Sequence, residues 1–197
     1  MGKLFYLMGK SSSGKDHIYE RLIRMKDLDL KRFILYTTRP MRDGEEEGRE
    51  YHFTDPDELK HLEDAGKVIE KRVYQTVHGP WIYFTADNGE MAAEGSRWLG
   101  IGTPESYCVL RDYFGGNNVL PVYIEVDDGI RLERALQRER SQEKPDYAEM
   151  CRRYLSDLED FSEEKLEKAG ITKRFSNDGE LETCIDEIAS WILINGW

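Results

Sequence analysis

The stretch LFYLMGKSSSGKD, residues 4–16, decides the fold of this chain of 197 residues. Residues 4–8 form a short apolar run that ends at a glycine, which predicts a buried strand. Residues 9–15, GKSSSGK, satisfy the pattern G-x-x-x-x-G-K. Residues 17–25 then carry apolar side chains at helical spacing. The stretch therefore predicts a strand, a glycine-bounded loop and a helix in immediate succession.

A loop with this pattern, between a strand and a helix, is typical of a phosphate-binding P-loop. Successive backbone N–H groups at a helix N-terminus wrap around a phosphate, and Lys15 reaches the outer phosphates of a nucleotide. Glycine is needed where the backbone turns tightly and comes close to the ligand. We therefore expect the nucleotide to contact Gly9, Ser11, Ser12, Ser13, Gly14, Lys15 and Asp16.

The eighth position of the loop is Asp16, where Ser or Thr usually places a hydroxyl on a magnesium ion. A carboxylate is itself a good ligand for this hard cation, so Asp16 is the candidate metal ligand and Mg²⁺ the expected cofactor. The added charge beside the nucleotide phosphates makes sense only when the metal offsets it. The alternative is that Asp16 simply caps the helix.

Strands and helices alternate along much of the remaining chain. The expected strands cover 32–36, 98–101, 119–126 and 173–176, and the expected helices cover 104–114, 127–140, 147–168 and 181–194. The run VLPVYIEV at 119–126 is apolar almost throughout, which favours a parallel sheet covered on both faces. The alternation predicts an α/β fold in which a parallel sheet flanked by helices forms the P-loop core.

Residues 37–90 have a different character, with several Gly and Pro and short alternating stretches at 68–77 and 81–85. One short helix fits at 56–65. We interpret this segment as an inserted mixed α/β lobe, so that residues 1–36 and 91–197 form the core.

The net charge of −11, from 39 acidic and 28 basic residues, repels phosphate-rich polymers, so nucleic acid is not an expected partner. The arginines cluster, however, at 39 and 42 and again at 131, 134, 138, 140, 152 and 153. Such clusters suit a small, multiply charged anion, and ion pairing on helix surfaces is the alternative. Three scattered cysteines and the lack of a long apolar run favour a cytoplasmic protein that does not cross a membrane.

The segment TTRPMRDGEEEGREYHF, residues 37–53, is the second candidate anion site. Arg39 and Arg42 would offer planar, bidentate donors to a phosphate dianion, and Tyr51 would add a hydroxyl. The alternative is a solvated loop in which these arginines pair with the acidic residues at 45–47.

Several motifs follow one another in order along nearly the whole chain. After the P-loop come T-T-R-x-x-R at 37–42 and G-E-x-x-G-x-x-Y-x-F at 44–53. Further along lie Val-Ile-Glu at 68–70, Ile-Tyr-Phe-Thr at 82–85 and Asn-Asp at 177–178. Together they resemble the guanylate kinase family, and the resemblance implies an enzyme that transfers a phosphoryl group from ATP to GMP.

The resemblance also implies roles for single residues in the inserted lobe, which would bind the acceptor. The GMP phosphate would be held by Arg39, Arg42, Tyr51 and Tyr83. Glu70 would accept hydrogen bonds from guanine N1–H and the 2-amino group, with Thr85 assisting at the base. Adenine would leave that carboxylate unsatisfied, so the arrangement would discriminate between the two purines.

For the ATP side, the resemblance implies a helical lid over about 131–153. Arg134, Arg138 and Arg153 would belong to the lid, with Arg138 and Arg153 reaching across the transferring phosphoryl group. Asn177 would lie at the adenine of ATP, and Arg134 would also contact this nucleotide. The groups expected to act in catalysis are Lys15, Arg42, Arg138 and Arg153.

The chain departs from the family pattern at the acceptor pocket. The family carries Asp-x-Asp where this chain has Gly100 and Gly102, and Leu35 replaces a serine that contacts guanine. Four extra residues separate Glu70 from Tyr83. One hypothesis is that Asp16 replaces one of the missing carboxylates.

The expected reaction is in-line phosphoryl transfer from ATP to GMP by a monomer or a homodimer, with catalysis by positioning and charge neutralisation. Two alternatives remain open. One is a kinase of another nucleoside monophosphate or of a sugar phosphate. The other is a non-catalytic guanylate-kinase-like module that binds a protein partner.

Overall fold

The structure is a computed structural model, and it describes residues 1–42, 44–76 and 79–196. Its larger sheet has five parallel strands in the order β2-β7-β1-β8-β9. These strands are β1 (Lys3–Gly9), β2 (Leu30–Arg32), β7 (Arg97–Gly102), β8 (Val119–Glu125) and β9 (Arg174–Ser176). The central strand β1 is buried over nearly its whole length because it is covered on both faces.

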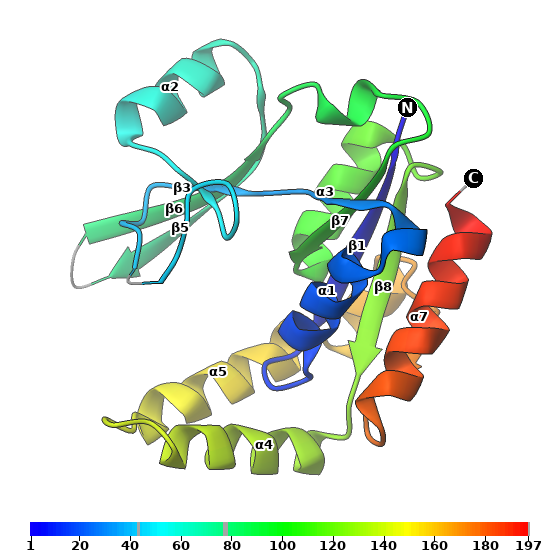
Figure 1. The fold of residues 1–197 in the computed structure, drawn as a ribbon. Coiled ribbons are helices and arrows are strands. Elements are labelled where there is room, and N and C mark those ends of the chain that lie inside the picture. The colour runs from blue at the N-terminus through cyan, green and yellow to red at the C-terminus, as the bar shows by residue number, and fades with distance from the viewer. Residues whose placement is uncertain (43, 77–78, 197) are drawn as a thin grey trace.

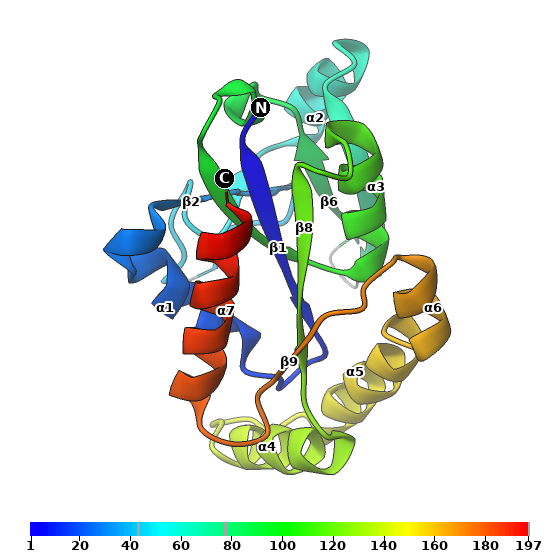
Figure 2. The ribbon, with the colours of Figure 1, turned by 90° about the vertical axis from the view of Figure 1, so that its right-hand side faces the viewer.

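Helices cover the two faces of this sheet with separate apolar clusters. On one face, α1 (Lys15–Arg24) and α7 (Leu181–Asn195) pack through residues such as Ile18 and Ile188. On the other, α3 (Pro104–Phe114) and α6 (Glu163–Lys168) pack through Leu110 and Leu166. Figure 2 shows the sheet between these two layers. The α/β core expected from the sequence is therefore confirmed.

A second sheet of four strands lies to one side of the core, in the order β4-β3-β6-β5 (Figure 1). Its elements are β3 (Tyr36–Thr37), β4 (His52–Phe53), α2 (Pro56–Asp64), β5 (Val68–Thr76) and β6 (Gly79–Ala86). β5 and β6 form an antiparallel pair, and a small apolar cluster around Phe84 joins the sheet to α2. Val77, where the strand expected from Val68 ends, lies outside the described residues.

Two expected elements are divided in the structure. The strand expected at 32–36 is split, because β2 stays in the parallel sheet while β3 pairs with β6 in the second sheet. The helix expected at 147–168 is α5 (Tyr147–Asp160) followed by α6. Between them Phe161 turns into the core and stacks on Tyr123, with ring centroids 6.0 Å apart. Apolar spacing does not reveal this corner.

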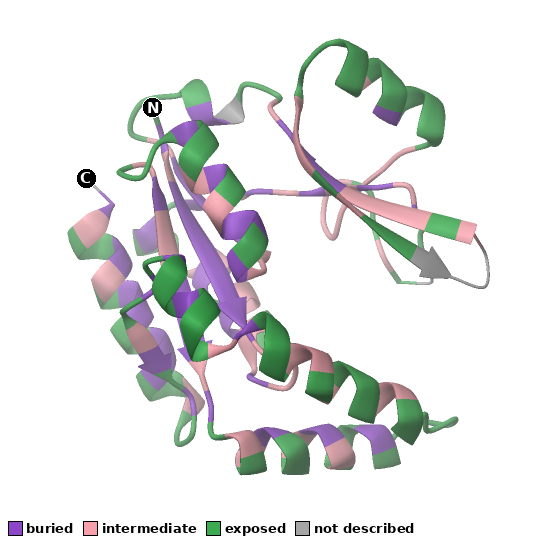
Figure 3. Cartoon of the chain, turned by 180° about the vertical axis from the view of Figure 1, so that it is seen from behind, coloured by how far each residue is buried: buried purple, intermediate pink, exposed green. Residues whose placement is uncertain are grey.

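Helices α4 (Asp128–Arg140) and α5 form an arm at the carboxyl end of the parallel strands. Much of this arm is exposed, in contrast to the buried strands (Figure 3), and none of the residues of α5 is buried. Short 3₁₀ helices at Lys26–Leu28 and Glu90–Ala92 complete the described elements. Within the described ranges, no helix combines the length and the apolar character needed to cross a membrane.

Candidate functional site

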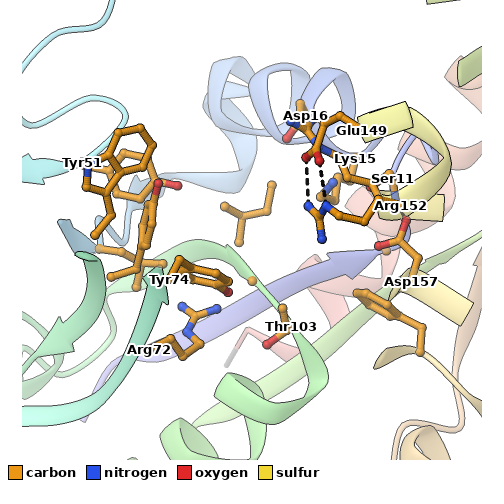
Figure 4. A pocket seen from close by; sticks show the side chains of 18 residues that line it. Ser11, Lys15, Asp16, Tyr51, Arg72, Tyr74, Thr103, Glu149, Arg152 and Asp157 are labelled. Atoms are coloured by element: carbon orange, nitrogen blue, oxygen red, sulfur yellow. Dashed lines mark hydrogen bonds and ion pairs between the residues drawn. The ribbon is translucent and has the colours of Figure 1, made fainter. Parts of the chain in front are cut away.

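A cavity of about 540 Å³, the main cavity of the candidate site, opens where the P-loop, the second sheet and α5 meet. The P-loop side contributes Ser11, Lys15 and Asp16. The hairpin of β5 and β6 contributes Arg72, Tyr74, Trp81 and Tyr83, and α5 contributes Glu149, Arg152, Arg153 and Asp157 (Figure 4). The expected P-loop and acceptor lobe thus face one space, at the carboxyl end of parallel strands where α/β proteins usually bind ligands.

The P-loop has the backbone conformation that a phosphate cradle requires. Gly14 has a φ of +83°, and a side chain there would also meet the amide nitrogen of Asn177 at 2.6 Å. Ser12 adopts a positive φ of 63° although it is not glycine. The hydroxyls of Ser12 and Ser13 are buried without a hydrogen-bond partner among the described residues. A polar ligand would satisfy them, so the loop fits a bound phosphate.

Asn177 supports the loop directly. Its amide Nδ2 donates to the carbonyl oxygen of Ser13 at 2.8 Å, and only 4% of the residue is exposed. Arg134 in turn donates from Nη2 to the carbonyl oxygen of Asn177 at 2.9 Å. The structure therefore brings together the two residues that were expected on the ATP side, and shows Asn177 in contact with the P-loop backbone.

Both helices of the arm hold the P-loop at one residue, Ser11. The Ser11 backbone N–H donates to Asp157 Oδ2 of α5 at 2.7 Å. The Ser11 carbonyl accepts from Arg131 Nη1 of α4 at 2.9 Å. Arg131 is only 1% exposed, and it also pairs with Asp128 at 2.8 Å.

Asp128, whose side chain is 44% exposed, and Lys10 extend this cluster of charges towards the surface. Lys10 Nζ pairs with Asp128 at 3.0 Å, so Asp128 joins the P-loop to the start of α4. Burial would raise the pKa of the Asp128 carboxyl, but hydrogen bonds from Arg131 and Lys10 hold the pKa below its ordinary value. The cluster couples the position of the arm to the backbone of the P-loop.

The arginines expected in the lid lie along the arm. Arg153 and Arg152 of α5 both pair with Glu149, at 2.7 and 2.6 Å, and these pairs lower the Glu149 pKa to about 2. Arg138 of α4 lines a smaller cavity of about 300 Å³ together with Ser12 and Arg153. Arg138 and Arg153 are thus brought beside the P-loop.

The two arginines expected to hold an acceptor phosphate, Arg39 and Arg42, lie outside the lining of the main cavity. Arg39 is 3% exposed and forms a bidentate pair with Glu45, at 3.0 and 2.8 Å. Its burial would lower the Arg39 pKa, but Glu45 raises it overall. Arg42 is exposed, and neither arginine lines the main cavity. Tyr51 and Tyr83 do line it, with ring centroids 5.5 Å apart.

Glu70 and Thr85, the expected readers of the base, bond to each other rather than lining the cavity. Thr85 Oγ1 donates to Glu70 Oε1 at 2.9 Å. Arg72 also donates to Glu70, from Nε at 3.2 Å and from Nη2 at 3.4 Å. Arg72 lines the cavity whereas Glu70 does not, so the guanidinium is the member of this group that faces the ligand space.

Tyr6 occupies the space next to Gly100 and Gly102. A Cβ atom on Gly100 would lie 3.0 Å from Tyr6 Cδ2, and one on Gly102 would lie 2.6 Å from Tyr6 Cζ. The Tyr6 hydroxyl shares a hydrogen bond of 2.9 Å with Ser106, and burial raises the Tyr6 pKa to about 12. The phenol from β1 therefore fills the place where longer side chains on β7 would project.

Several residues of the site escaped the sequence analysis. They are Tyr6, Arg72, Tyr74, Trp81, Asp128 and Asp157, together with the buried role of Arg131. For Arg72 and Tyr74 a signal existed, because they follow Glu70 at the strand period of two and so share its face. No local pattern indicates that Asp157 contacts the P-loop. None indicates that Tyr6 fills the space beside Gly102.

The residues present also fit a divalent cation carried by nucleotide phosphates. Asp16 is exposed and lines the cavity one position after Lys15. Its carboxylate and the buried serine hydroxyls are the hard oxygen ligands that Mg²⁺ prefers. Among the described residues no group of three or more acidic, His or Cys side chains is placed to bind a metal alone. Asp16 would therefore share the ion with the nucleotide.

Comparison with known proteins finds similarity in the first part of this chain. A sequence profile of guanylate kinase matches residues 1–80. Over these residues the sequence of this chain is similar to that of guanylate kinases. The guanylate kinase of Cupriavidus metallidurans is 37% identical over 78 residues, which are 40% of this chain and 34% of the relative. That of Porphyromonas gingivalis is 34% identical over 85 residues, 43% and 44% of the two chains. The matches span about a third to under a half of these relatives.

Solved structures extend the likeness of fold to the whole chain. A guanylate kinase from Anaplasma phagocytophilum has a TM-score of 0.62 and 19% identity, covering 99% of this chain and 86% of its own. A gluconokinase from Sinorhizobium meliloti has a TM-score of 0.52 and 12% identity, covering 99% and 94%. At these identities the likeness shows the fold alone, which is that of the P-loop NTPases.

Proposed function

We propose that this chain is a kinase of the guanylate kinase family, which transfers a phosphoryl group from ATP to a nucleoside monophosphate, with GMP as the first acceptor to test. The observation that carries the proposal is the shared cavity, which Lys15 of the P-loop and the aromatic wall of β5 and β6 line together. A donor nucleotide on the P-loop and an acceptor in the lobe at 37–90 would then meet in one space.

Catalysis would depend on positioning the two substrates and on neutralising the negative charge of the phosphates. An acceptor phosphate oxygen is already nucleophilic, so no covalent intermediate or strong base is needed. Lys15 would contact the outer phosphates of ATP, and Arg138 and Arg153 would contact the transferring group from the arm. Mg²⁺, when bound with ATP at Asp16, would supply further positive charge. Closure of the arm at about 131–153 would exclude water.

The phosphate of the acceptor would require a local change at Arg39. Glu45 engages the guanidinium of Arg39. A phosphate dianion could replace this carboxylate, since both accept the same bidentate pair of hydrogen bonds. Arg42 would then approach from the exposed loop, while Tyr51 and Tyr83 already line the cavity. From the three scattered cysteines of the sequence we also propose that the protein acts in the cytoplasm, and we expect a monomer or a homodimer.

The test is ADP release from ATP and Mg²⁺ with GMP, dGMP, AMP, IMP, CMP and UMP offered separately. We expect turnover with GMP, and a loss of at least about a hundredfold in kcat for Lys15→Ala. The exposed Lys26, outside the cavity, provides the matched control Lys26→Ala. Wild-type rates in Lys15→Ala would overturn the proposal.

A non-catalytic binding module is the second candidate, favoured by the pairing of Arg39 with Glu45 and by the absence of carboxylates at Gly100 and Gly102. The retained P-loop lysine and the buried serine hydroxyls oppose it. Thermal unfolding with and without ATP and Mg²⁺ separates the two, because a ligand that binds only the folded state raises the midpoint temperature. A module without nucleotide function should not respond.

A further inference from the structure

The wall of the main cavity is built from matching positions on two strands. Residues 70, 72 and 74 of β5 share one face of the strand because side chains alternate. The register places Glu70 opposite Thr85, Arg72 opposite Tyr83 and Tyr74 opposite Trp81. These three rungs run from the buried interior of the second sheet towards the tip of the hairpin. In order, the rungs present a carboxylate, then a guanidinium beside one aromatic ring, and then two aromatic rings.

The carboxylate of this wall is covered, and the guanidinium is not. The Glu70 side chain is 8% exposed, and Thr85 is 1% exposed. Glu70 already accepts from the Thr85 hydroxyl and from Arg72. Arg72, with 19% of its side chain exposed, lines the main cavity beside Tyr74 (Figure 4). A ligand that enters from the cavity therefore meets Arg72 before it meets Glu70.

No other carboxylate replaces Glu70 on this side among the described residues that line the cavity. Gly100 and Gly102 carry none, and Tyr6 fills the adjoining space. The acidic residues of the lining, Asp16, Glu149 and Asp157, all belong to the P-loop side or to α5. The hydrogen-bonding group offered to the far end of an acceptor is consequently a donor, whereas a carboxylate would only accept.

The guanidinium of Arg72 has a second pair of N–H donors that its bonds to Glu70 do not use. A guanidinium has five N–H donors in a planar fork. Glu70 takes the edge formed by Nε and Nη2. The remaining edge, between Nη1 and Nη2, matches two neighbouring acceptors in one plane. The O6 and N7 atoms of guanine are such a pair, whereas adenine offers an amino group and N7 at the same place.

The rings around Arg72 suit a flat, planar base. Tyr74 and Trp81 line the same wall, and aromatic rings stack on any base regardless of its identity. The acceptor phosphate must lie near Lys15 to receive the phosphoryl group. In Figure 4, Arg72 lies well away from Lys15, so it faces the base end of a bound nucleotide.

We propose that Arg72 is the specificity-determining residue of the acceptor site, and that it selects 6-oxopurine nucleoside monophosphates by donating to O6 and N7. The inference rests on the proposed function, since it names the acceptor class of the same site. GMP, IMP and XMP differ only at C2, away from O6 and N7, so they are recognised alike. AMP is rejected because its 6-amino group opposes an Arg72 donor.

The experiment measures kcat/KM and, separately, the equilibrium affinity of the folded protein for GMP, IMP, XMP, AMP and 7-deaza-GMP. For the wild type, GMP, IMP and XMP should agree within about tenfold. AMP should be poorer by about ten- to a hundredfold, the discrimination that a bidentate arginine gives. 7-Deaza-GMP, which lacks N7, should bind more weakly than GMP by several-fold.

The decisive variant is Arg72→Lys, which keeps a positive charge beside Glu70 but removes the planar fork. It should lose most of the preference for GMP over AMP, and it should no longer distinguish GMP from 7-deaza-GMP. Lys71→Gln is the matched control, because Lys71 is the adjacent residue and pairs with Glu63 on the exposed side. The control should keep the wild-type pattern.

Two outcomes overturn the inference while leaving the proposed function intact. One is a preference of more than a hundredfold for GMP over both IMP and XMP, which would show that Glu70 reads the 2-amino group. The other is an unchanged GMP-over-AMP preference in Arg72→Lys. Failure of the whole panel to bind or to react, in protein that binds ATP, would overturn the proposed function and the inference with it.

Discussion

The two ends of the main cavity hold their charged groups in different ways. At the P-loop end, Arg131 pairs with Asp128 on its own helix and also contacts Ser11 and Asp157, which lie far from it in the chain. At the wall formed by β5 and β6, the proposed acceptor wall, Arg72 pairs with Glu70, only two residues away on the same strand. Arg131 is almost completely buried, whereas Arg72 keeps part of its side chain at the cavity.

This difference between Arg131 and Arg72 suggests that the first contributes to the stability of the fold and the second to the choice of ligand. A buried charge that joins several elements cannot be removed without leaving its partners uncompensated, so it acts on the folded state as a whole. A pair within one strand adds little to the contacts between elements. Its substitution changes which hydrogen-bonding group the cavity presents. We therefore expect variants at the P-loop end to change the free energy of unfolding, and variants at the acceptor wall to change ligand preference.

The largest effect is expected for Arg131→Met, which removes the centre of the P-loop cluster. Asp128 keeps its pair with Lys10, but Asp157, whose side chain is only 15% exposed, loses its cation, and burial of an unpaired carboxylate is costly. We expect the free energy of unfolding to fall by about 3–5 kcal/mol. Urea unfolding followed by circular dichroism measures it.

The matched control for Arg131→Met lies on the same helix. Arg140→Met replaces an exposed arginine near the end of α4, so its effect should stay within about 0.5 kcal/mol. If both variants cost the same, the buried cluster contributes no more than an exposed charge. The distinction between the two ends of the cavity would then fail.

A smaller loss in the free energy of unfolding is expected for a substitution in β7, at Gly102, which lines the main cavity. Gly102→Ala places a methyl group 2.6 Å from Tyr6 Cζ, and overpacking of this kind costs about 1–3 kcal/mol. In the background of Tyr6→Leu the same substitution should cost less, because the ring is gone. A double-mutant cycle by urea unfolding measures the coupling.

Gly179→Ala is the control for this cycle. A Cβ there would meet nothing within 4 Å, so the change should stay within about 0.5 kcal/mol. An equal cost of Gly102→Ala in both backgrounds would mean that Tyr6 is not what excludes a side chain from position 102. Position 102 could then accommodate a carboxylate, and the argument that the acceptor wall offers only a donor would weaken.

The sequence predicted the P-loop end of the cavity more fully than the wall formed by β5 and β6. The P-loop was predictable because its mechanism depends on consecutive residues, from Gly9 to Lys15, between a strand and a helix. The parallel core followed from apolar runs such as 119–126. The corner at Phe161 was not predictable, because the helical spacing continues across it and tertiary packing decides the break.

The acceptor wall was predicted in position but not in detail. The resemblance pointed to Glu70, and strand alternation brings Arg72 and Tyr74 to the same face. Sequence alone does not tell which rung reaches the cavity and which is covered, since that depends on the register with β6. Nor does it show that Tyr6, from a different strand, fills the space beside Gly102. Side chains that meet across elements leave no pattern along the chain.

The smallest effect is expected for the exposed pairs of the arm, where Glu149 holds Arg152 and Arg153. These pairs lower the Glu149 pKa to about 2, below an unfolded value of about 4. A lowered folded pKa stabilises the protein above the unfolded pKa, and this contribution disappears as the pH falls towards 2. Because the pairs are solvent-exposed, Glu149→Gln should cost only about 0.5 kcal/mol at pH 7. Urea unfolding of both proteins between about pH 3 and pH 7 should show the difference shrinking as the pH falls. A difference that stays constant with pH would show that Glu149 contributes through packing rather than charge.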